Sequence, residues 1–212
     1  MSHRSGIDGA PALRMVQTQL VTRGITDARL LDVMGRVPRH EFVPPALSSH
    51  AYDDGPLPIG EGQTISQPFI VAAMTMALRI QSSDRVLEIG TGCGYQTAVL
   101  AELASRVYSV ERIASLADSA SRRLAKLGYT NIQVKSGDGF QGWVEEAPFD
   151  KIILTAAPSR LPLAVLEQLG PGGILVAPIG EVDQVLTVMT RTPRGIEKSE
   201  TMAVRFVPMI EN

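Results

Sequence analysis

Short apolar runs alternate with stretches of helical periodicity between Arg85 and Gly180, and no other feature restricts the fold as strongly. The apolar runs read RVLEIG, RVYSVE, NIQVKS, DKIILTAA and GGILVAPIG, and segments such as YQTAVLAELAS and IASLADSASRRLAKLG separate them. Strands that are apolar throughout and joined by helices are typical of a parallel sheet covered on both faces. We therefore predict an α/β fold with a doubly wound, mostly parallel sheet.

Two helices are predicted ahead of this region. In residues 11–23 apolar side chains recur on one helical face, and Gly24 marks the expected end of the helix. Thr26 and Asp27 then offer an N-cap for a second helix over residues 28–37. The chain should therefore reach the sheet through an N-terminal helical pair.

The alternation stops after Gly180. The runs QVLTVMTRT and AVRFVPMI predict two further strands, over residues 184–192 and 203–210, with a turn near Pro193 to Gly195. Strands joined by a short turn run antiparallel. We expect these two strands to close the sheet with an antiparallel C-terminal pair.

Proline and glycine are frequent from Arg36 to Gln63, where we expect an irregular but ordered connection lying over the core. Connections of this length in compact domains are more often functional than incidental. The connection leads to Ser66, which we predict to be the N-cap of a helix over residues 67–78, with Pro68 in its first turn.

The composition argues against several classes of function. The 212 residues carry a net charge of -2 without a basic stripe, which disfavours nucleic acid as a partner. A single cysteine excludes an internal disulfide framework, and three histidines without ligand-like spacing predict no metal site. The N-terminus lacks the apolar core of a signal peptide, and no apolar run approaches the roughly 20 residues of a membrane helix. We expect a soluble, cytoplasmic protein of one domain.

Three glycines follow the first apolar run, in EIGTGCGYQ. Gly90, Gly92 and Gly94 fall between a predicted strand and a predicted helix, where a tight turn and a close approach to a ligand both need residues without a side chain. Tyr95 stands where the dinucleotide fingerprint G-x-G-x-x-G would have its third glycine, which disfavours NAD. Cys93 has no recognisable base beside it, so packing explains it better than a role as nucleophile.

Acidic side chains lie at the ends of neighbouring predicted strands. Glu111 ends the second run about 20 residues beyond the loop, where a carboxylate accepts hydrogen bonds from both ribose hydroxyls of a bound adenosine. Asp138, followed by Gly139, comes after the third run and is placed to accept from an adenine amino group. Glu88 adds negative charge, which suits the sulfonium and ammonium of S-adenosylmethionine better than a pyrophosphate. Each acid has a structural explanation when taken alone, but their joint spacing favours a cofactor site.

These segments together resemble the protein-L-isoaspartate O-methyltransferase family over about residues 12–210. The resemblance rests on VPRHEFVP, AYDDGPLPIGEGQTISQP, VLEIGTGCGYQTAVLAEL, VYSVER, GDGFQGW, APFDKIILTAA, LEQLGPGGILVAPIG and VRFVPM. GQTISQP is the most specific of these motifs, because the glycine loop occurs in many methyltransferases. Cys93 departs from the small hydroxyl residue or alanine that is more common in the family.

The resemblance implies the S-adenosylmethionine-dependent methyltransferase fold and methyl transfer to the free α-carboxylate of L-isoaspartyl residues in damaged proteins. S-adenosylhomocysteine would be the product of the cofactor. The methyl ester would collapse to a succinimide that partly reopens as normal aspartate, so the reaction would initiate repair. In this interpretation residues 1–11 are flexible, residues 12–82 form the substrate side, and residues 83–212 form the cofactor-binding sheet core.

The resemblance also assigns the site residue by residue. Ser66 becomes the active-site hydroxyl, and Thr64 and Ile65 become parts of the acceptor pocket. Val207 belongs to the terminal VRFVPM segment, which either pairs with the substrate backbone as an added strand or is an ordinary edge strand. The cofactor contacts are assigned to Glu88, Gly90, Gly92, Gly94, Glu111, Asp138 and Gly139.

This chemistry needs no strong base, because the isoaspartyl carboxylate is already ionised near pH 7. We expect the Ser66 hydroxyl and the N–H groups at the following helix start to hold that anion, so that positioning is the main catalytic device. The competing interpretations are a methyltransferase of small molecules or nucleic acids, a NAD-dependent dehydrogenase, and a non-catalytic cofactor-binding relative. The expected partners are damaged proteins and peptides, without nucleic acid or membrane, and the protein is expected to be a monomer.

Overall fold

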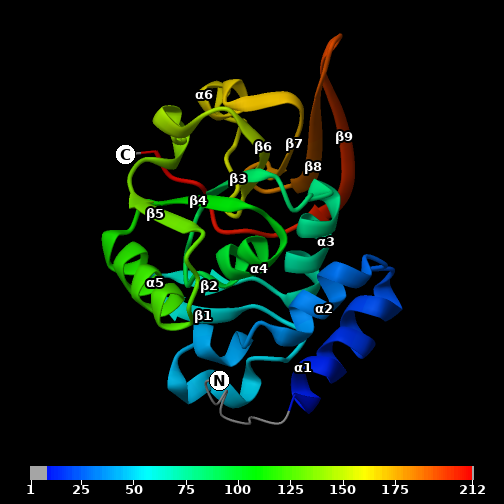
Figure 1. Cartoon of the computed structure of the whole chain (residues 1–212), viewed down its shortest axis with the longest axis vertical. Coiled ribbons are helices and arrows are strands. Elements are labelled where there is room, and N and C mark those ends of the chain that lie inside the picture. Colours follow the sequence, from blue (N-terminus) through cyan, green and yellow to red (C-terminus); the bar gives the residue numbers. More distant parts are fainter. Residues whose placement is uncertain (1–8, 212) are drawn as a thin grey trace.

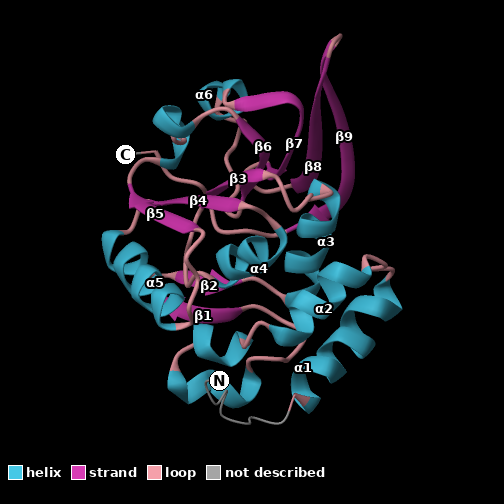
Figure 2. Ribbon diagram, in the orientation of Figure 1, coloured by secondary structure: helices cyan, strands magenta, loops and turns pink. Residues whose placement is uncertain are grey.

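The computed structural model describes residues 9–211, and its core is a seven-stranded sheet flanked by helices (Figure 1, Figure 2). The strands are β3 (Arg85–Ile89), β4 (Arg106–Glu111), β5 (Ile132–Ser136), β6 (Phe149–Leu154), β7 (Leu169–Ile179), β8 (Gln184–Thr192) and β9 (Gly195–Val204). Their order is β5-β4-β3-β6-β7-β8-β9. The five strands β3 to β7 run parallel to one another, whereas β8 pairs antiparallel with both β7 and β9. The predicted fold class is confirmed.

Helices cover both faces of the sheet, which explains why its strands are apolar on both sides. On one face α3 (Pro68–Leu78) and α4 (Tyr95–Leu103) pack through Met74, Leu78 and Leu100 against strand residues such as Val86 and Ile153. On the other face, α6 (Leu163–Glu167) packs against β6 and β7. The amphipathic helix α5 (Ala114–Lys126) lies beside β4 and β5.

The N-terminal helical pair forms as predicted. The first helical segment begins with α1 (Ala10–Met15), continues through a π-helical and a 3-10 turn, and ends at Gly24 with φ of 85°. Asp27 caps α2 (Ala28–Arg36) by accepting a hydrogen bond from the Leu30 N–H at 3.0 Å. Of the segment expected to be flexible, residues 1–8 lie outside the described residues, and Ala10 and Pro11 form the first turn of α1.

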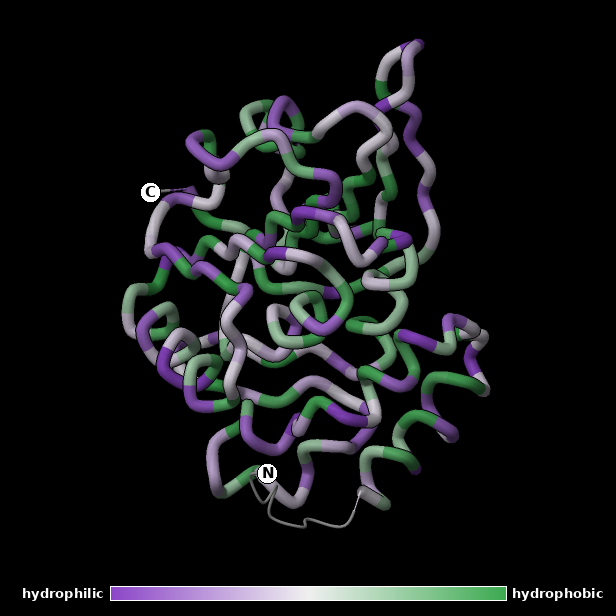
Figure 3. The backbone as a smooth tube through the Cα atoms, in the orientation of Figure 1, coloured by the Kyte–Doolittle hydropathy of each residue, from purple (hydrophilic) through white to green (hydrophobic). Residues whose placement is uncertain are grey.

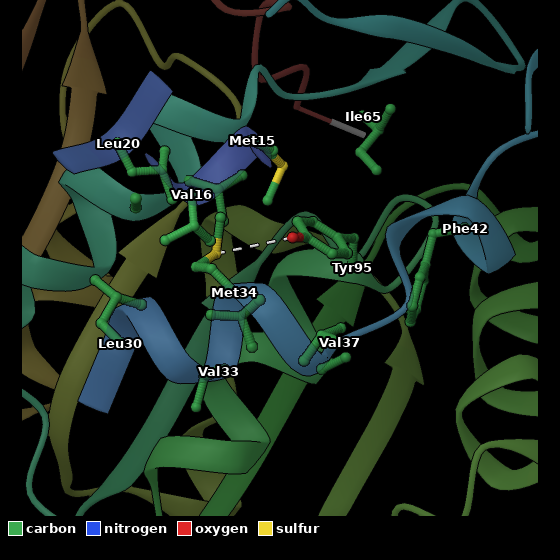
Figure 4. Packing of buried hydrophobic residues seen from close by; sticks show 14 of the residues in the cluster. Met15, Val16, Leu20, Leu30, Val33, Met34, Val37, Phe42, Ile65 and Tyr95 are labelled. Atoms are coloured by element: carbon green, nitrogen blue, oxygen red, sulfur yellow. Dashed lines mark hydrogen bonds between the residues drawn. The ribbon is translucent and has the colours of Figure 1, made fainter. Parts of the chain in front are cut away.

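The apolar faces of this pair meet α4 in a buried cluster (Figure 4). Met15, Leu20 and Met34 are at most 1% exposed, and the Tyr95 hydroxyl donates a hydrogen bond to the Met34 sulfur at 3.8 Å. Phe42 packs edge-on against the Tyr95 ring at 5.5 Å between ring centroids. The N-terminal region is therefore fixed against the residues that directly follow the glycine loop.

The connection after α2 contains more regular structure than its composition predicts. Two 3-10 helices, Arg39–Phe42 and Pro45–His50, lead to a small antiparallel hairpin of β1 (Leu57–Gly60) and β2 (Gln63–Ile65). Glycines and prolines concealed this hairpin, because they dominate its turn and its edges.

The predicted N-cap of the next helix is wrong. Helix α3 begins at Pro68, its N-cap is Gln67, and no side chain caps it. Because proline occupies the first helical position, the capping position falls on the residue directly before it, and Ser66 stands one residue too early.

The second C-terminal strand is also displaced from its predicted place. The turn at residues 193–194 is confirmed, but β9 covers Gly195–Val204 instead of residues 203–210. Beyond β9, Pro208 forms a single parallel bridge with Ala157. The β8–β9 hairpin projects from the body of the molecule, and its outer strand is largely hydrophilic (Figure 1, Figure 3). This polarity hid β9 from a search for apolar runs.

The sheet topology determines where a ligand would bind. The chain passes from β3 to β4 and β5 on one side, and later returns to β6 and β7 on the other. The loops after β3, β4 and β6 therefore meet at the carboxyl edge, where open α/β sheets bind ligands. In the part of the chain that the structure describes, no helix has both the length and the apolar character needed to cross a membrane.

Candidate active site

The glycine loop after β3 has a backbone that other residues could not follow. Gly90, Gly92 and Gly94 have φ of 101°, 54° and 89°, in the left-handed region that favours glycine. A Cβ atom on Gly90 would lie 2.3 Å from the Thr155 hydroxyl oxygen. That hydroxyl donates to the Gly90 carbonyl at 2.6 Å, so the loop lies directly against the end of β6.

Glu111 lies beside this loop, as the sequence predicts. One carboxylate oxygen accepts a hydrogen bond from the Gly92 N–H at 2.8 Å, and the other accepts from the Ile113 N–H at 2.9 Å. The side chain is largely buried and lines the cavity described below. Each oxygen keeps a second lone pair, so the carboxylate can still accept hydrogen bonds from a ligand.

Glu88 occupies a different place from the other predicted cofactor residues. It is fully buried in β3 beneath the loop and does not line the cavity. One of its carboxyl oxygens accepts hydrogen bonds from the Thr97 and Ser109 hydroxyls, both at 2.6 Å, and its Oε1 has no hydrogen-bond partner among residues 9–211. Burial raises the pKa of Glu88 to about 8, although the two hydroxyl donors lower it in part. The carboxyl is therefore mainly neutral at pH 7, and it supports the loop from below.

Asp138 and Gly139 were both predicted to lie beside the adenine, but only one of them lines the cavity. The Asp138 carboxylate accepts a hydrogen bond from the Phe140 N–H at 2.9 Å and caps a short 3-10 turn, and its side chain does not line the cavity. Gly139 does line it. A Cβ on Gly139 would lie 2.5 Å from a methyl carbon of Ile89. Its lack of a side chain therefore keeps this wall of the cavity open.

A cavity that opens to solvent lies over these loops. The residues present fit S-adenosylmethionine, because glycine backbone, a ribose-facing carboxylate and little positive charge surround the space. The lining includes Gln63, Thr64, Ile65, Ser66, Gly90, Thr91, Gly92, Cys93, Tyr95, Gln96, Glu111, Arg112, Ile113, Gly139, Thr155, Phe206, Val207 and Met209.

A second, groove-like space adjoins this cavity. Its lining includes Pro56, Gln67, Ile70 and the end of β9 with the residues that follow, Ala203 to Val207. The cavity and the groove share five lining residues, Thr64, Ser66, Thr155, Phe206 and Val207. A small ligand in the cavity and a peptide in the groove would therefore meet at these residues.

The predicted acceptor residues come together at this junction. Thr64 is exposed and Ser66 half-buried, and both face the cavity and the groove, whereas the buried Ile65 lines the cavity alone. Val207 reaches the junction from the C-terminal segment, where its carbonyl accepts a hydrogen bond from the Ala157 N–H at 2.9 Å. Segments far apart in the sequence thus supply the predicted acceptor side.

Several lining residues were missed by reasoning from the sequence. Thr155 directly follows β6 within the run DKIILTAA, so the rule that ligands gather at carboxyl ends of strands could have found it. Phe206 and Met209 belong to the VRFVPM segment, which was considered only as a strand added to the substrate backbone or as an edge strand. Tyr95 carries no comparable signal, because an apolar lining residue looks like any core residue. In residues 9–211, no group of three or more histidine, cysteine or acidic side chains is arranged to hold a metal ion.

The chain is similar to known proteins over nearly its whole length. A family model described as Protein-L-isoaspartate(D-aspartate) O-methyltransferase (PCMT) matches residues 13–212. A protein-L-isoaspartate O-methyltransferase of a Synechococcus strain is 53% identical over 205 residues, which cover 93% of this chain and 84% of the relative. One from Gloeobacter violaceus is 54% identical over 197 residues, covering 92% and 96%.

A solved structure also matches the chain over nearly its whole length, at lower sequence identity. A structure from Plasmodium falciparum, described as a protein-L-isoaspartate O-methyltransferase in complex with S-adenosyl-L-homocysteine, has a TM-score of 0.83 and 26% identity. The match covers 95% of this chain and 99% of that chain.

Proposed function

The chain belongs to the protein-L-isoaspartate(D-aspartate) O-methyltransferase family, and we propose that it methylates the free α-carboxylate of L-isoaspartyl residues in damaged proteins and peptides. The observation that carries this proposal is the junction of the cavity and the groove at Thr64, Ser66, Thr155, Phe206 and Val207. A reaction between a small donor and a large peptide needs two adjoining spaces of this kind.

S-adenosylmethionine, when bound, supplies a methyl group whose carbon–sulfur bond breaks as a bond to the carboxylate oxygen forms, with the electron pair passing to sulfur. The glycine-loop backbone at Gly90 and Gly92, which line the cavity, would lie against the cofactor, and Glu111 would accept hydrogen bonds from its ribose hydroxyls. Gly94 does not line the cavity, because it packs against Ala120 and Leu124 of α5. Gly139 would leave space for the adenine, with Asp138 at its edge. In this scheme Glu88 supports the loop and does not contact the cofactor, since it is fully buried beneath it.

The acceptor side would hold and orient the carboxylate. Thr64 and Ser66 place neutral hydroxyls at the junction, where they would donate hydrogen bonds to an anion. Neutral donors orient the carboxylate without repelling a positively charged donor molecule. No proton has to be removed, so orientation of the two reactants is the main contribution, and it can supply roughly 7–11 kcal/mol of the barrier.

The groove would bind the peptide through its backbone. Residues Ala203 to Val207 line it, and the first two of them end β9, the edge strand of the sheet, where main-chain pairing would tolerate many sequences around the damaged residue. The neighbouring backbone nitrogen would displace methanol from the methyl ester so formed, and water would partly reopen the resulting succinimide as normal aspartate. Residues 12–82 would then form the substrate side of one domain and residues 83–212 its cofactor side, with Ala203 to Val207 adding a wall of the peptide groove, in a monomeric, cytoplasmic protein that needs no nucleic acid.

The test is methyl transfer from labelled S-adenosylmethionine to two synthetic peptides that differ only in aspartate versus isoaspartate. We expect incorporation of label into the isoaspartyl peptide and none above background into its twin. Equal labelling of both peptides, or labelling of neither, would contradict the proposal.

A further inference from the structure

Arg39 is the largest of the fully buried side chains, and the reaction proposed above gives it no role. It opens the 3-10 helix Arg39–Phe42, within the VPRHEFVP segment. Among the described residues it forms no ion pair with a carboxylate. Burial lowers the pKa of its guanidinium, with the nearby Tyr95 acting in the opposite direction. A buried cation without an anionic partner is costly, so its presence calls for an explanation.

The donors of Arg39 join segments that are far apart in the sequence. Its Nε donates to the Ala51 carbonyl and its Nη2 donates to the Ser66 carbonyl, each at 2.7 Å. Its guanidinium carbon lies 4.8 Å from the centroid of the Tyr95 ring. Tyr95 directly follows the glycine loop and begins α4. One side chain therefore connects the loop that carries Ser66 to the residue that follows the cofactor loop.

The bond to the Ser66 carbonyl matters because little else holds this residue. Ser66 stands between β2 and α3, and the helix start after it has no side-chain cap. Within residues 9–211 no hydrogen bond is made by the Ser66 hydroxyl, so the backbone determines where that hydroxyl lies. The planar guanidinium offers two donors in a fixed geometry, which the single ammonium of lysine cannot reproduce.

Arg39 has a further hydrogen-bond donor, which none of the contacts above uses. Its Nη1 is buried and has no hydrogen-bond partner in the described part of the chain. Ser66 and Tyr95, which the guanidinium contacts, both line the cavity, whereas Arg39 lies behind them. The positive charge therefore stands uncompensated behind the wall on which the substrate carboxylate would lie.

We infer that Arg39 is a positioning residue for the proposed reaction: it fixes Ser66 through its carbonyl and holds that segment against the end of the glycine loop. This inference rests on the proposed function, because the junction at Ser66 gives the contact its purpose. It adds a residue outside the cavity to those that determine peptide turnover.

The test compares Arg39→Lys with the wild-type chain, using kcat and KM for an isoaspartyl peptide, S-adenosylhomocysteine affinity by calorimetry, and thermal unfolding. Lysine keeps the charge but loses the paired donors. We expect kcat/KM for the peptide to fall at least tenfold, while S-adenosylhomocysteine affinity stays within about threefold. A folded Arg39→Lys protein with wild-type kcat/KM would overturn the inference.

Arg85→Lys is the matched control. Arg85 also donates to a carbonyl, that of Glu146 at 2.8 Å, and lies over the Tyr108 ring at 5.1 Å. It differs in being ion-paired with the Glu146 carboxylate at 3.2 Å, and it stands at the amino end of β3, away from the cavity. We expect this variant to lose stability without losing kcat/KM. If both variants lose turnover only in proportion to their loss of stability, Arg39 is merely structural and the inference fails.

A double-mutant comparison tests whether Arg39 affects peptide turnover through Ser66. It remains informative if Arg39→Lys is unstable. Arg39→Met removes the buried charge together with the donors, and it is assayed alone and combined with Ser66→Ala. If Arg39 acts through Ser66, the double variant loses no more turnover than Ser66→Ala alone, whereas independent, multiplicative losses would overturn the inference. Absence of turnover by the wild-type chain would instead contradict the proposed function, and the inference with it.

Discussion

Ser66 is the residue on which the proposed acceptor chemistry depends most. It lines both the cavity and the groove, and in the proposed reaction its hydroxyl donates a hydrogen bond to the substrate carboxylate. Loss of a hydrogen bond to a charged group costs roughly 1.5–3 kcal/mol, so Ser66→Ala should lower kcat/KM about 10- to 100-fold. The free energy of unfolding should change by less than about 1 kcal/mol, because the hydroxyl caps no helix. Equal turnover at saturating peptide would remove Ser66 from the mechanism; Ser159→Ala, at an exposed position outside both spaces, is the control.

Glu88 predicts a pH dependence of stability. Its pKa is raised to about 8 by burial, so between pH 4.5 and 8 the folded protein keeps a proton that the unfolded chain has lost. The free energy of unfolding must therefore fall as the pH rises through this range. Glu88→Gln removes this contribution, and the variant should gain about 3 kcal/mol relative to wild type between pH 5.5 and 8.5. Denaturant unfolding at both values measures the difference, and an equal difference at both would contradict the burial argument.

Residues at turns were easier to predict than residues whose role depends on orientation. Gly90, Gly92 and Gly94 form the predicted tight turn between strand and helix, and all three adopt a left-handed backbone there. Glu88 was assigned to the cofactor, yet its side chain lies below the loop. The sequence places an acid in a strand but does not say which way it points relative to a loop that leaves the strand two residues later.

At the scale of elements, the glycine loop makes a prediction of its own. In Gly90→Ala the new methyl group would clash with the Thr155 hydroxyl. Hydrogen bonds to the Ile89 and Gly90 carbonyls hold that hydroxyl in place. We expect S-adenosylhomocysteine affinity to fall roughly 100-fold, about 2.7 kcal/mol, by calorimetry.

Gly24→Ala is the control for this prediction. Gly24 also has a positive φ, of 85°, but no atom lies within 4 Å of a Cβ placed there. The control should lose about 1–2 kcal/mol of stability from backbone strain and keep its affinity. Similar S-adenosylhomocysteine affinities in Gly90→Ala and Gly24→Ala would mean that cofactor binding does not depend on the close contact between Gly90 and Thr155.

The elements that reasoning from the sequence missed share a physical cause. The strand β9 is polar over most of its length because the projecting hairpin buries little of it, so no apolar run in the sequence indicates a strand there. The hairpin of β1 and β2 is rich in glycine and proline, with Gly60, Glu61 and Gly62 all at positive φ. Apolar periodicity in a sequence indicates which face of an element is buried. These strands are stabilised mainly by backbone pairing and turns, so they lack that periodicity.

On the scale of the whole molecule, alternation of strands and helices was sufficient to predict the parallel sheet and its carboxyl-edge site. It was not sufficient to predict that residues 63–66, 90–93 and 206–210 line one cavity, because that meeting depends on how the N-terminal helices and the C-terminal segment pack. The family resemblance supplied this connection, and the junction of the two spaces gives it a physical basis.

The identity of the cofactor predicts a change in the stability of the whole chain. A ligand that binds only the folded state at 100 times its Kd raises the free energy of unfolding by about 2.7 kcal/mol. S-adenosylhomocysteine should do so in a thermal or denaturant titration, and NAD at the same concentration should not. Stabilisation by NAD alone would favour the dehydrogenase alternative.

The most direct measurement is a crystal structure of the protein with S-adenosylhomocysteine and an isoaspartyl peptide bound together. The thioether sulfur is expected in the cavity, the peptide along Ala203 to Val207, and the isoaspartyl carboxylate between the sulfur and the Ser66 hydroxyl. A peptide bound elsewhere, or a sulfur that faces away from the carboxylate, would contradict the proposed reaction.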